Sequence, residues 1–215
     1  KDTILVSVCA VDSELGTVQP IRKITEILKD FPNCRLHVDA TQAIGKTELV
    51  MDGVDTMSIA PHKFYGLNGS GLLLKKSSLI IEPQTHGGSS TTPYRSGTPA
   101  LALAVSIEKA LQLTLTQQEE RIRYVRQLNE YLKTALLHYP AVRINSPEGA
   151  VPHILNLSVQ GLKGTVFQRV LSERGVCVSV KSACSAEGTP SKAVFAVSGD
   201  RKNALSSWRV SLSHL

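Results

Sequence analysis

The stretch Ser58-Ile59-Ala60-Pro61-His62-Lys63-Phe64-Tyr65-Gly66 follows a run of β-forming residues, so Lys63 lies where a strand passes into a loop. About one β–α–β spacing earlier comes His37-Val38-Asp39-Ala40-Thr41-Gln42, in which Asp39 ends a second apolar strand. A lysine amine condenses with an aldehyde, and a neighbouring aspartate keeps a pyridine nitrogen protonated. The two segments together predict a site for pyridoxal 5′-phosphate, whereas Lys63 taken alone reads as a solvated surface lysine.

The first hundred residues predict an α/β fold. Residues 3–8 read as a buried strand, and Pro20 opens a helix that runs to about residue 31. Further strands are expected at residues 35–39, 54–60 and 71–74. This β-α-β-β-β order with nearly continuous apolar strands indicates a buried, mainly parallel sheet. We therefore assign residues 1–99 to part of a large α/β domain.

The second half predicts a smaller α+β domain. Residues 86–99 are rich in Gly, Ser, Thr and Pro, which is typical of a domain boundary. Residues 100–138 then become helical. Six apolar residues form an amphipathic stripe: Ile122, Val125, Leu128, Leu132, Ala135 and Leu136. Short strands are expected at 142–144, 154–158, 176–179 and 208–212, with a helix at 164–173. We assign residues 100–215 to a linker helix and this domain.

Composition excludes several classes of protein. The chain has 215 residues and a net charge of +6, but its basic residues are too scattered for a nucleic-acid-binding arm. It has no apolar run of membrane-spanning length and no signal peptide. Four cysteines without CxxC spacing favour a reducing cytoplasm and indicate neither a disulfide scaffold nor a metal site. Because strand-like segments lie at both ends, we expect a piece of a longer protein.

Residues 40–47 match a loose nucleotide-binding loop, the Walker A pattern with Ala in the first position. A phosphate cradle needs flexible backbone followed by a helix N-terminus. This loop has one glycine and carries β-branched Thr41 and Ile44, and the segment after it is too short for the usual helix. Nucleotide binding is therefore the weaker interpretation.

Three other residues invite a chemical interpretation. Cys184 lies in a small-residue, polar loop beside Lys181, which suits a reactive thiol. The other cysteines lie in or beside apolar strands and are expected to be buried: Cys9, Cys34 and Cys177. Arg209, inside an apolar strand, needs an anionic partner if buried, and a substrate carboxylate would serve. Asp39 alone could instead cap a helix starting near Thr41.

Taken together, these segments resemble the cysteine desulfurases, which are pyridoxal-phosphate enzymes of the class V aminotransferase family with the fold-type I architecture. The resemblance extends over nearly the whole chain. It rests on the runs Ser13-Glu14-Leu15-Gly16-Thr17-Val18-Gln19-Pro20, His37-Val38-Asp39-Ala40-Thr41-Gln42, His62-Lys63 with Tyr65-Gly66, Arg95-Ser96-Gly97-Thr98, Ser182-Ala183-Cys184-Ser185 and Ser207-Trp208-Arg209-Val210-Ser211.

The resemblance implies roles at the cofactor. Lys63 is the Schiff-base lysine and proton shuttle, Asp39 pairs with the pyridine nitrogen, and Gln42 bonds the ring's phenolic oxygen. His62 lies against the phosphate. Thr98 reaches the phosphate of the partner subunit's cofactor, which implies a homodimer. Ser13 stands at a cofactor-contacting position where the family usually has asparagine.

The resemblance also implies the reaction. L-cysteine becomes L-alanine, while Arg209 holds the substrate carboxylate and Cys184 takes the sulfur as a persulfide. The acceptors are sulfur-carrier or iron–sulfur scaffold proteins in the cytoplasm. A related class V enzyme, such as a selenocysteine lyase or an aminotransferase, is the alternative and need not use Cys184.

Several positions depart from the family pattern. Ala60 replaces a serine that donates to the phosphate, and Ser90-Thr91-Thr92-Pro93 replaces Gln-Glu-Arg-Gly. The family's N-terminal third, which carries a ring-stacking histidine, and its C-terminal helical end have no counterpart among these 215 residues. These departures favour a second alternative, a degenerate non-catalytic homologue. They also lead us to expect that the 215-residue chain is inactive by itself.

Overall fold

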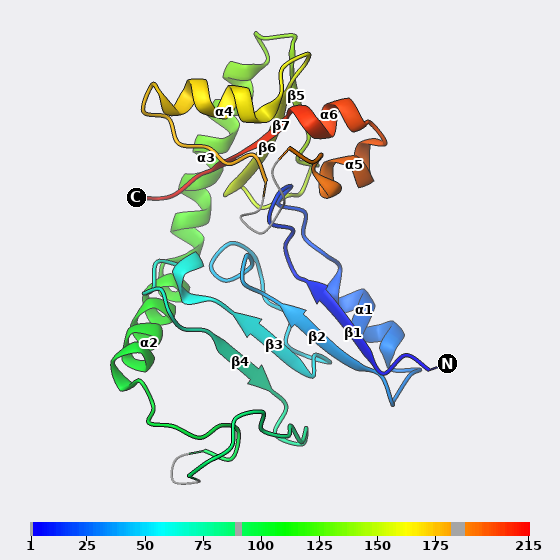
Figure 1. The fold of residues 1–215 in the computed structure, drawn as a ribbon, viewed down its shortest axis with the longest axis vertical. Helices are drawn as coiled ribbons and strands as arrows, with labels where there is room; N and C mark the ends of the chain where they lie inside the picture. The colour runs from blue at the N-terminus through cyan, green and yellow to red at the C-terminus, as the bar shows by residue number, and fades with distance from the viewer. Residues whose placement is uncertain (1, 89–91, 182–187) are drawn as a thin grey trace. The chain divides into compact units, whose positions relative to one another are not determined.

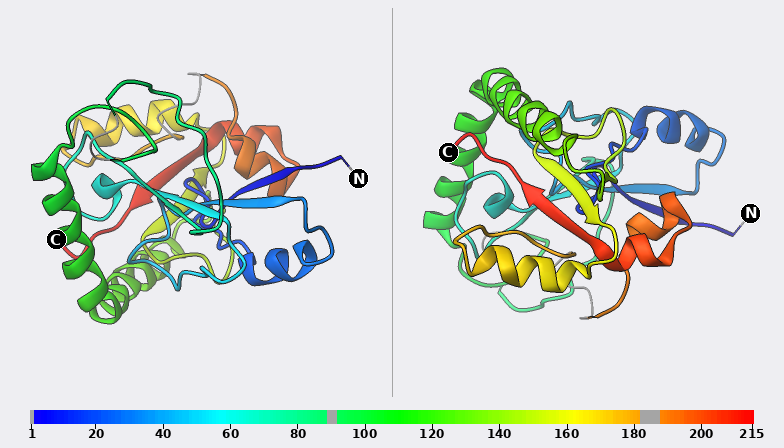
Figure 2. Two further views of the ribbon diagram at one scale, coloured as in Figure 1. Left: turned by 90° about the horizontal axis from the view of Figure 1, so that it is seen from below. Right: turned by 90° about the horizontal axis from the view of Figure 1, so that it is seen from above.

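The computed structural model describes residues 2–88, 92–181 and 188–215, which form two compact units (Figures 1 and 2). Unit 1 contains the chain up to Ala10 and Pro20–Thr116. Unit 2 contains Val11–Gln19 and Gln117–Leu215. None of the helices in the described ranges combines the length and apolar composition that a membrane crossing requires.

Unit 1 is built on a four-stranded sheet of order β1-β2-β3-β4 (Figure 1). The strands are β1 (Leu5–Cys9), β2 (Arg35–Asp39), β3 (Thr56–Ile59) and β4 (Leu72–Lys75). The first three strands are parallel, and β4 is antiparallel to β3. This arrangement confirms the predicted mainly parallel sheet, and β2 has the bounds predicted from the sequence.

Helices complete unit 1. α1 (Ile21–Leu28) follows Pro20 and connects β1 with β2, while α2 (Leu101–Thr116) ends the unit. The buried side chain of Thr25 on α1 lies against Gly53, where an added Cβ would come within 2.7 Å of the Thr25 Cβ. Because Gly53 also has a φ of +78°, no other residue fits this turn before β3 without strain.

The expectation that the first strand and three of the cysteines are buried is wrong in part. Leu5 and Cys9 are exposed and Val6 and Val8 are half-buried, because β1 lies at one edge of the described sheet and its side chains alternate. Cys34 is buried as predicted.

The expected strand at residues 176–179 is also wrong. Only an isolated bridge joins Ser179 to Arg209, so this segment lacks a ladder of its own. In this bridge Ser179 exchanges backbone hydrogen bonds with Arg209. Val178 packs against the core, and Cys177 is exposed.

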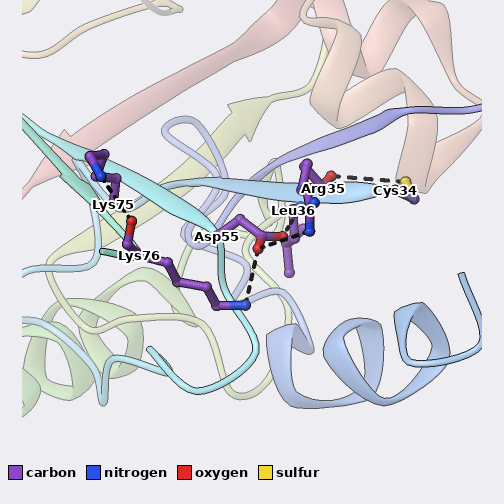
Figure 3. Close-up of polar contacts among 6 residues, drawn as sticks. All are labelled: Cys34, Arg35, Leu36, Asp55, Lys75 and Lys76. Atoms are coloured by element: carbon purple, nitrogen blue, oxygen red, sulfur yellow. Dashed lines mark hydrogen bonds and ion pairs between the residues drawn. The ribbon is translucent and has the colours of Figure 1, made fainter. Parts of the chain in front are cut away.

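The carboxylate of Asp55 links three strands of unit 1 (Figure 3). Asp55 precedes β3, and its Oδ2 accepts a 2.8 Å hydrogen bond from the Leu36 amide in β2. Its Oδ1 lies 3.0 Å from Lys76 Nζ, just beyond β4, and 3.9 Å from the guanidinium of Arg35. Backbone hydrogen bonds connect the same three segments, because Asp55 N donates to Leu36 O and Lys76 N donates to Asp55 O.

These contacts decide the charge state of Asp55, which is 7% exposed. Burial acts to raise the pKa of its carboxyl group. The hydrogen bonds from Leu36 and Lys76 and the charges of Lys76 and Arg35 outweigh burial, so the pKa lies below its ordinary value. Asp55 is therefore ionised at neutral pH and holds β2, β3 and β4 in register.

Unit 2 contains an antiparallel sheet of order β5-β6-β7. Its elements are α3 (Gln118–Leu136), β5 (Val142–Ile144), β6 (Ile154–Val159), α4 (Gly164–Ser172), α5 (Lys192–Ser198), α6 (Arg201–Ser206) and β7 (Ser207–Ser211). Leu155, Leu157 and Trp208 form the core, and the rings of Trp208 and Phe167 lie 4.7 Å apart. The predicted strands at 142–144, 154–158 and 208–212 and the helix at 164–173 are confirmed within one residue.

The short helices α5 and α6 were not predicted. Both begin at a side-chain cap: Ser191 Oγ accepts from the Val194 amide, and Asp200 Oδ1 accepts from the amides of Lys202 and Asn203. These caps were visible in the sequence. At seven and six residues, however, neither helix is long enough to establish a clear hydrophobic period.

We predict that Asp55→Asn destabilises unit 1 by about 1–3 kcal/mol, because it weakens charge-assisted hydrogen bonds at a buried position. Hydrogen exchange of the Leu36 amide should accelerate, and exposed Asp30→Asn is the matched control. Since the folded-state pKa of Asp55 is lowered, its contribution is present above the unfolded value of about 3.9 and is lost as pH falls through the folded value. Unchanged Leu36 exchange in the variant would contradict this role.

Candidate active site

Two predicted site residues of unit 1 emerge at the same edge of the sheet. Asp39 is the last residue of β2 and pairs with Ser58 in β3. Strand β3 ends at Ile59. The 3-10 helix η1 (Pro61–Lys63) begins two residues later, and Lys63 is its last residue. Because β2 and β3 are parallel, both groups follow carboxyl ends of strands, where open α/β sheets bind ligands.

Asp39 is half-buried, and one of its two carboxylate oxygens accepts a hydrogen bond. Its Oδ1 accepts a 2.9 Å hydrogen bond from the Thr41 amide, and its backbone oxygen accepts from the Ala10 amide. The alternative reading of Asp39 as a helix cap is therefore half right: the carboxylate caps a turn, and no helix begins at Thr41. No contact to Oδ2 is found within the described ranges, so this oxygen can accept a hydrogen bond from a ligand.

His37 is a residue of this site that the sequence analysis missed. Its Nδ1 lies 2.9 Å from Thr56 Oγ1 and its Nε2 lies 3.3 Å from Ser58 Oγ. His37 and Asp39 are two residues apart on β2 and share a face of the sheet. Through these two contacts the imidazole of His37 links β2 to β3 next to Asp39. The available signal was the alternation of polar residues at 37 and 39 and at 56 and 58.

The conformation of the turn that carries Lys63 is fixed by its packing and its backbone geometry. Phe64 is 1% exposed and its carbonyl accepts from Thr114 Oγ1 in α2. Tyr65 has a φ of +70°, and a Cβ on Gly66 would lie 2.8 Å from the Cβ of Pro61. The main chain is thus constrained on both sides of Lys63. His62 and Lys63 are exposed, and no described residue hydrogen-bonds or pairs with Lys63 Nζ.

Gln42 lies in the turn after β2, where its Oε1 accepts a 2.8 Å hydrogen bond from Lys46 Nζ. Its amide nitrogen remains able to donate. The turn itself is packed: Ala43 and Ile44 are buried, and a Cβ on Gly45 would lie 2.3 Å from the Thr114 methyl group. No helix follows it before β3. This packed turn differs from the open cradle that a nucleotide phosphate needs.

In unit 2 the structure brings Ser13 and Arg209 together. Arg209 Nη1 donates a 2.6 Å hydrogen bond to the backbone oxygen of Ser13. Burial lowers the pKa of Arg209, whereas the negative charges of Glu14 and Asp12 act in the opposite direction. An arginine remains protonated in such surroundings. Arg209 Nε is buried and has no hydrogen-bond partner among the described residues.

Glu14 ties this region to α5. Its Oε2 accepts a 2.5 Å hydrogen bond from Ser191 Oγ at the start of α5, and its backbone oxygen accepts from Asn156 Nδ2 in β6. Ser191 is fully buried and Glu14 nearly so. The segment from Val11 to Gln19 is thus fixed to β6, α5 and β7.

One predicted site residue, Cys184, lies outside the described residues, and another, Thr98, is not joined to these groups. Thr98 is exposed, follows Gly97 at a φ of +107°, and belongs to unit 1. The described ranges contain no group of three or more His, Cys, Asp or Glu side chains able to hold a metal ion.

The residues at the carboxyl edge of unit 1 fit pyridoxal phosphate by their chemistry. They supply a primary amine on Lys63, a carboxylate oxygen on Asp39 and an amide donor on Gln42, which match the aldehyde, the ring nitrogen and the phenolic oxygen. Ala60 is extended and supplies no hydroxyl group for the phosphate.

The whole chain, residues 1–215, matches the family described as Aminotransferase class-V. The chain therefore belongs to the class V aminotransferases, a pyridoxal-phosphate-dependent family. It is 38% identical over 192 residues to the NifS/IcsS protein homolog of Lactobacillus delbrueckii subsp. bulgaricus, a match that covers 87% of this chain and 50% of the relative.

A second relative is the cysteine desulfurase IscS of Dictyoglomus turgidum, which is 33% identical over 202 residues, covering 92% of this chain and 51% of that protein. The solved structure of a NifS-like protein superposes with a TM-score of 0.88 at 31% identity, over 99% of this chain and 56% of that one. This neighbour confirms the predicted fold-type I architecture. The chain spans about half the length of the curated relatives it matches.

We predict that Arg209→Gln lowers the free energy of unfolding of unit 2 by about 1.5–3 kcal/mol, because it removes a charged hydrogen bond to Ser13 and leaves Glu14 and Asp12 without their cation. Arg209→Lys keeps the charge and should lose less. Urea titration followed by fluorescence of Trp208, the sole tryptophan, reports this unit directly. Equal loss in both variants would show that the charge contributes nothing.

Proposed function

We propose that the whole protein to which these residues belong is a cysteine desulfurase that converts L-cysteine to L-alanine and transfers the sulfur to Cys184. The observation that carries the proposal is the placement of Lys63 and Asp39 at adjacent carboxyl ends of parallel strands. The relatives named cysteine desulfurase support the choice of reaction within the family.

At this site Lys63 would hold the cofactor covalently, Asp39 the ring nitrogen, Gln42 the phenolic oxygen and His62 the phosphate. When bound, pyridoxal phosphate stabilises negative charge at the substrate α-carbon. Lys63 Nζ is exposed, so after release it can take the α-proton as a general base. Asp39 stays in place meanwhile, because Thr41 and the β2–β3 pairing fix it.

Arg209 and Cys184 would act on the substrate. The guanidinium of Arg209 holds the substrate carboxylate through a two-pronged hydrogen bond. The Cys184 thiolate attacks the substrate sulfur, so that an S–S bond forms as the C–S bond breaks, and the carbon skeleton leaves as alanine after protonation. The sulfur remains on Cys184 as a persulfide.

The proposal extends to the assembly. Residues 1–99 form part of the large domain, and residues 100–215 form the linker helix and part of the small domain. The enzyme is a cytoplasmic homodimer in which Thr98 reaches the cofactor phosphate of the other subunit, while Ser13 contacts the cofactor of its own. A sulfur-carrier or iron–sulfur scaffold protein receives the persulfide sulfur.

We predict that borohydride reduction in the presence of pyridoxal phosphate labels Lys63, because Lys63 is exposed and follows β3 at the sheet edge where β2 ends on Asp39. Peptide mapping should locate the pyridoxyl group there in the longest natural chain that contains these residues. Lys63→Arg should abolish the label and Lys29→Arg, an exposed control, should not. A label on Lys46 or Lys75 instead would contradict the assignment.

We predict that Cys184→Ser abolishes sulfide release from cysteine while the visible absorbance of bound cofactor persists, because the serine hydroxyl cannot accept the sulfur. The assay belongs in the longest natural chain that contains these residues. Cys177→Ser, which changes an exposed cysteine, is the control and should retain turnover. Full turnover by Cys184→Ser would favour the selenocysteine lyase or aminotransferase alternative.

A further inference from the structure

A cavity of about 750 Å³ lies within unit 2, among residues that the proposed reaction does not use. It is lined by residues of β5, the end of β6, the turn after β6 and α6. Arg143 in β5 and Ser158 in β6 are cross-strand partners and both line it. The turn after β6 and the first residues of α6 close the cavity. Its volume falls within the range of small-molecule sites, about 300–1,000 Å³.

The side chains that line this cavity carry more positive than negative charge. Arg143, Lys163 and Lys202 line it, and none of the three takes part in an ion pair among the described residues. Among the described residues that line the cavity, Asp200 is the acidic one, and it already accepts hydrogen bonds from two amides at the start of α6. Elsewhere in the chain the basic residues are scattered, but here three cations face one concave surface. Such an arrangement concentrates positive potential and attracts anions.

The floor of the cavity is rigid. Ser158 is 2% exposed; its hydroxyl accepts a 2.7 Å hydrogen bond from Asn145 Nδ2 and donates to the backbone oxygen of Asn203. Asn203 Nδ2 in turn donates to Asn145 Oδ1 at 2.9 Å. These bonds connect β5, β6 and α6 without using the three cations. The cavity is therefore preformed, which lowers the free-energy cost of binding.

The walls are partly apolar. Leu162 and Leu205 line the cavity together with Pro140 and Ala141. A bare inorganic anion would leave this surface without a partner. An organic anion that carries an apolar body beside its charges would cover it and gain affinity.

We propose that this cavity binds a small organic anion with at least two negative charges next to an apolar group, either a phosphate ester or a polycarboxylate. The cations Arg143, Lys163 and Lys202 bind the charges, and Leu162 and Leu205 contact the apolar body. This site is separate from the residues assigned to the desulfurase reaction and does not depend on that assignment.

The test is isothermal titration calorimetry of the 215-residue chain with ATP, citrate and pyrophosphate at constant ionic strength. ATP should bind more tightly than pyrophosphate if the class is a phosphate ester, because its base and ribose can cover the leucines. Citrate should bind most tightly if the class is a polycarboxylate. Binding of all three no tighter than that of sulfate would overturn the proposal.

Charge variants make the test specific. The triple variant Arg143→Gln, Lys163→Gln, Lys202→Gln should weaken binding about tenfold or more, as expected for the loss of three partly exposed ion pairs. The control Arg123→Gln, Arg126→Gln, Lys192→Gln removes the same charge from exposed positions of unit 2 and should have little effect. Trp208 fluorescence verifies that both variants fold. Equal weakening in the control, or tighter binding of a polyglutamate peptide than of any small anion, would contradict a small-molecule site.

Discussion

The candidate active site of unit 1 depends on the carboxylate of Asp55. It substitutes for a backbone acceptor at the Leu36 amide and holds Lys76 beyond β4, so a single side chain fixes β2 against β3 and β3 against β4 (Figure 3). The register of these strands determines where Asp39 ends β2 and where η1 leaves β3. A slip of one residue would turn Asp39 to the other face of the sheet. The contacts of His37 with Thr56 and Ser58 enforce the same register close to the edge.

In unit 2, the charged side chains of Arg209 and Glu14 hold one short segment of the chain in place. Arg209 donates to the backbone of Ser13, while Glu14 accepts from Ser191, so one short segment is attached to β7 and to α5. Each buried charge thus has an opposite charge or a hydrogen-bond donor nearby, which offsets the cost of its desolvation. The same arrangement leaves the buried Arg209 Nε without a hydrogen-bond partner in the described part of the chain.

The sequence predicted best those elements whose burial pattern is decided locally. β2 alternates buried and half-buried positions beyond Arg35 and was found with the correct bounds, and the apolar residues of β6 are buried on both faces. The exposure of Leu5 and Cys9 could not be predicted from the local sequence pattern, because it depends on β1 lying at the edge of the described sheet. The hydrogen bonds of His37 depend on which strand lies beside β2. The pairing of Ser13 with Arg209 joins residues 196 positions apart and was not predicted from the sequence.

In the proposed enzyme, Lys63 and Asp39 hold one cofactor at the carboxyl edge of the sheet. The most direct measurement is a crystal structure of the longest natural chain that contains these residues, grown with pyridoxal phosphate. We expect continuous electron density between the cofactor and Lys63 Nζ, with Asp39 Oδ2 within hydrogen-bonding distance of the ring nitrogen. A cofactor bound through another lysine, or with its ring nitrogen away from Asp39, would contradict this arrangement.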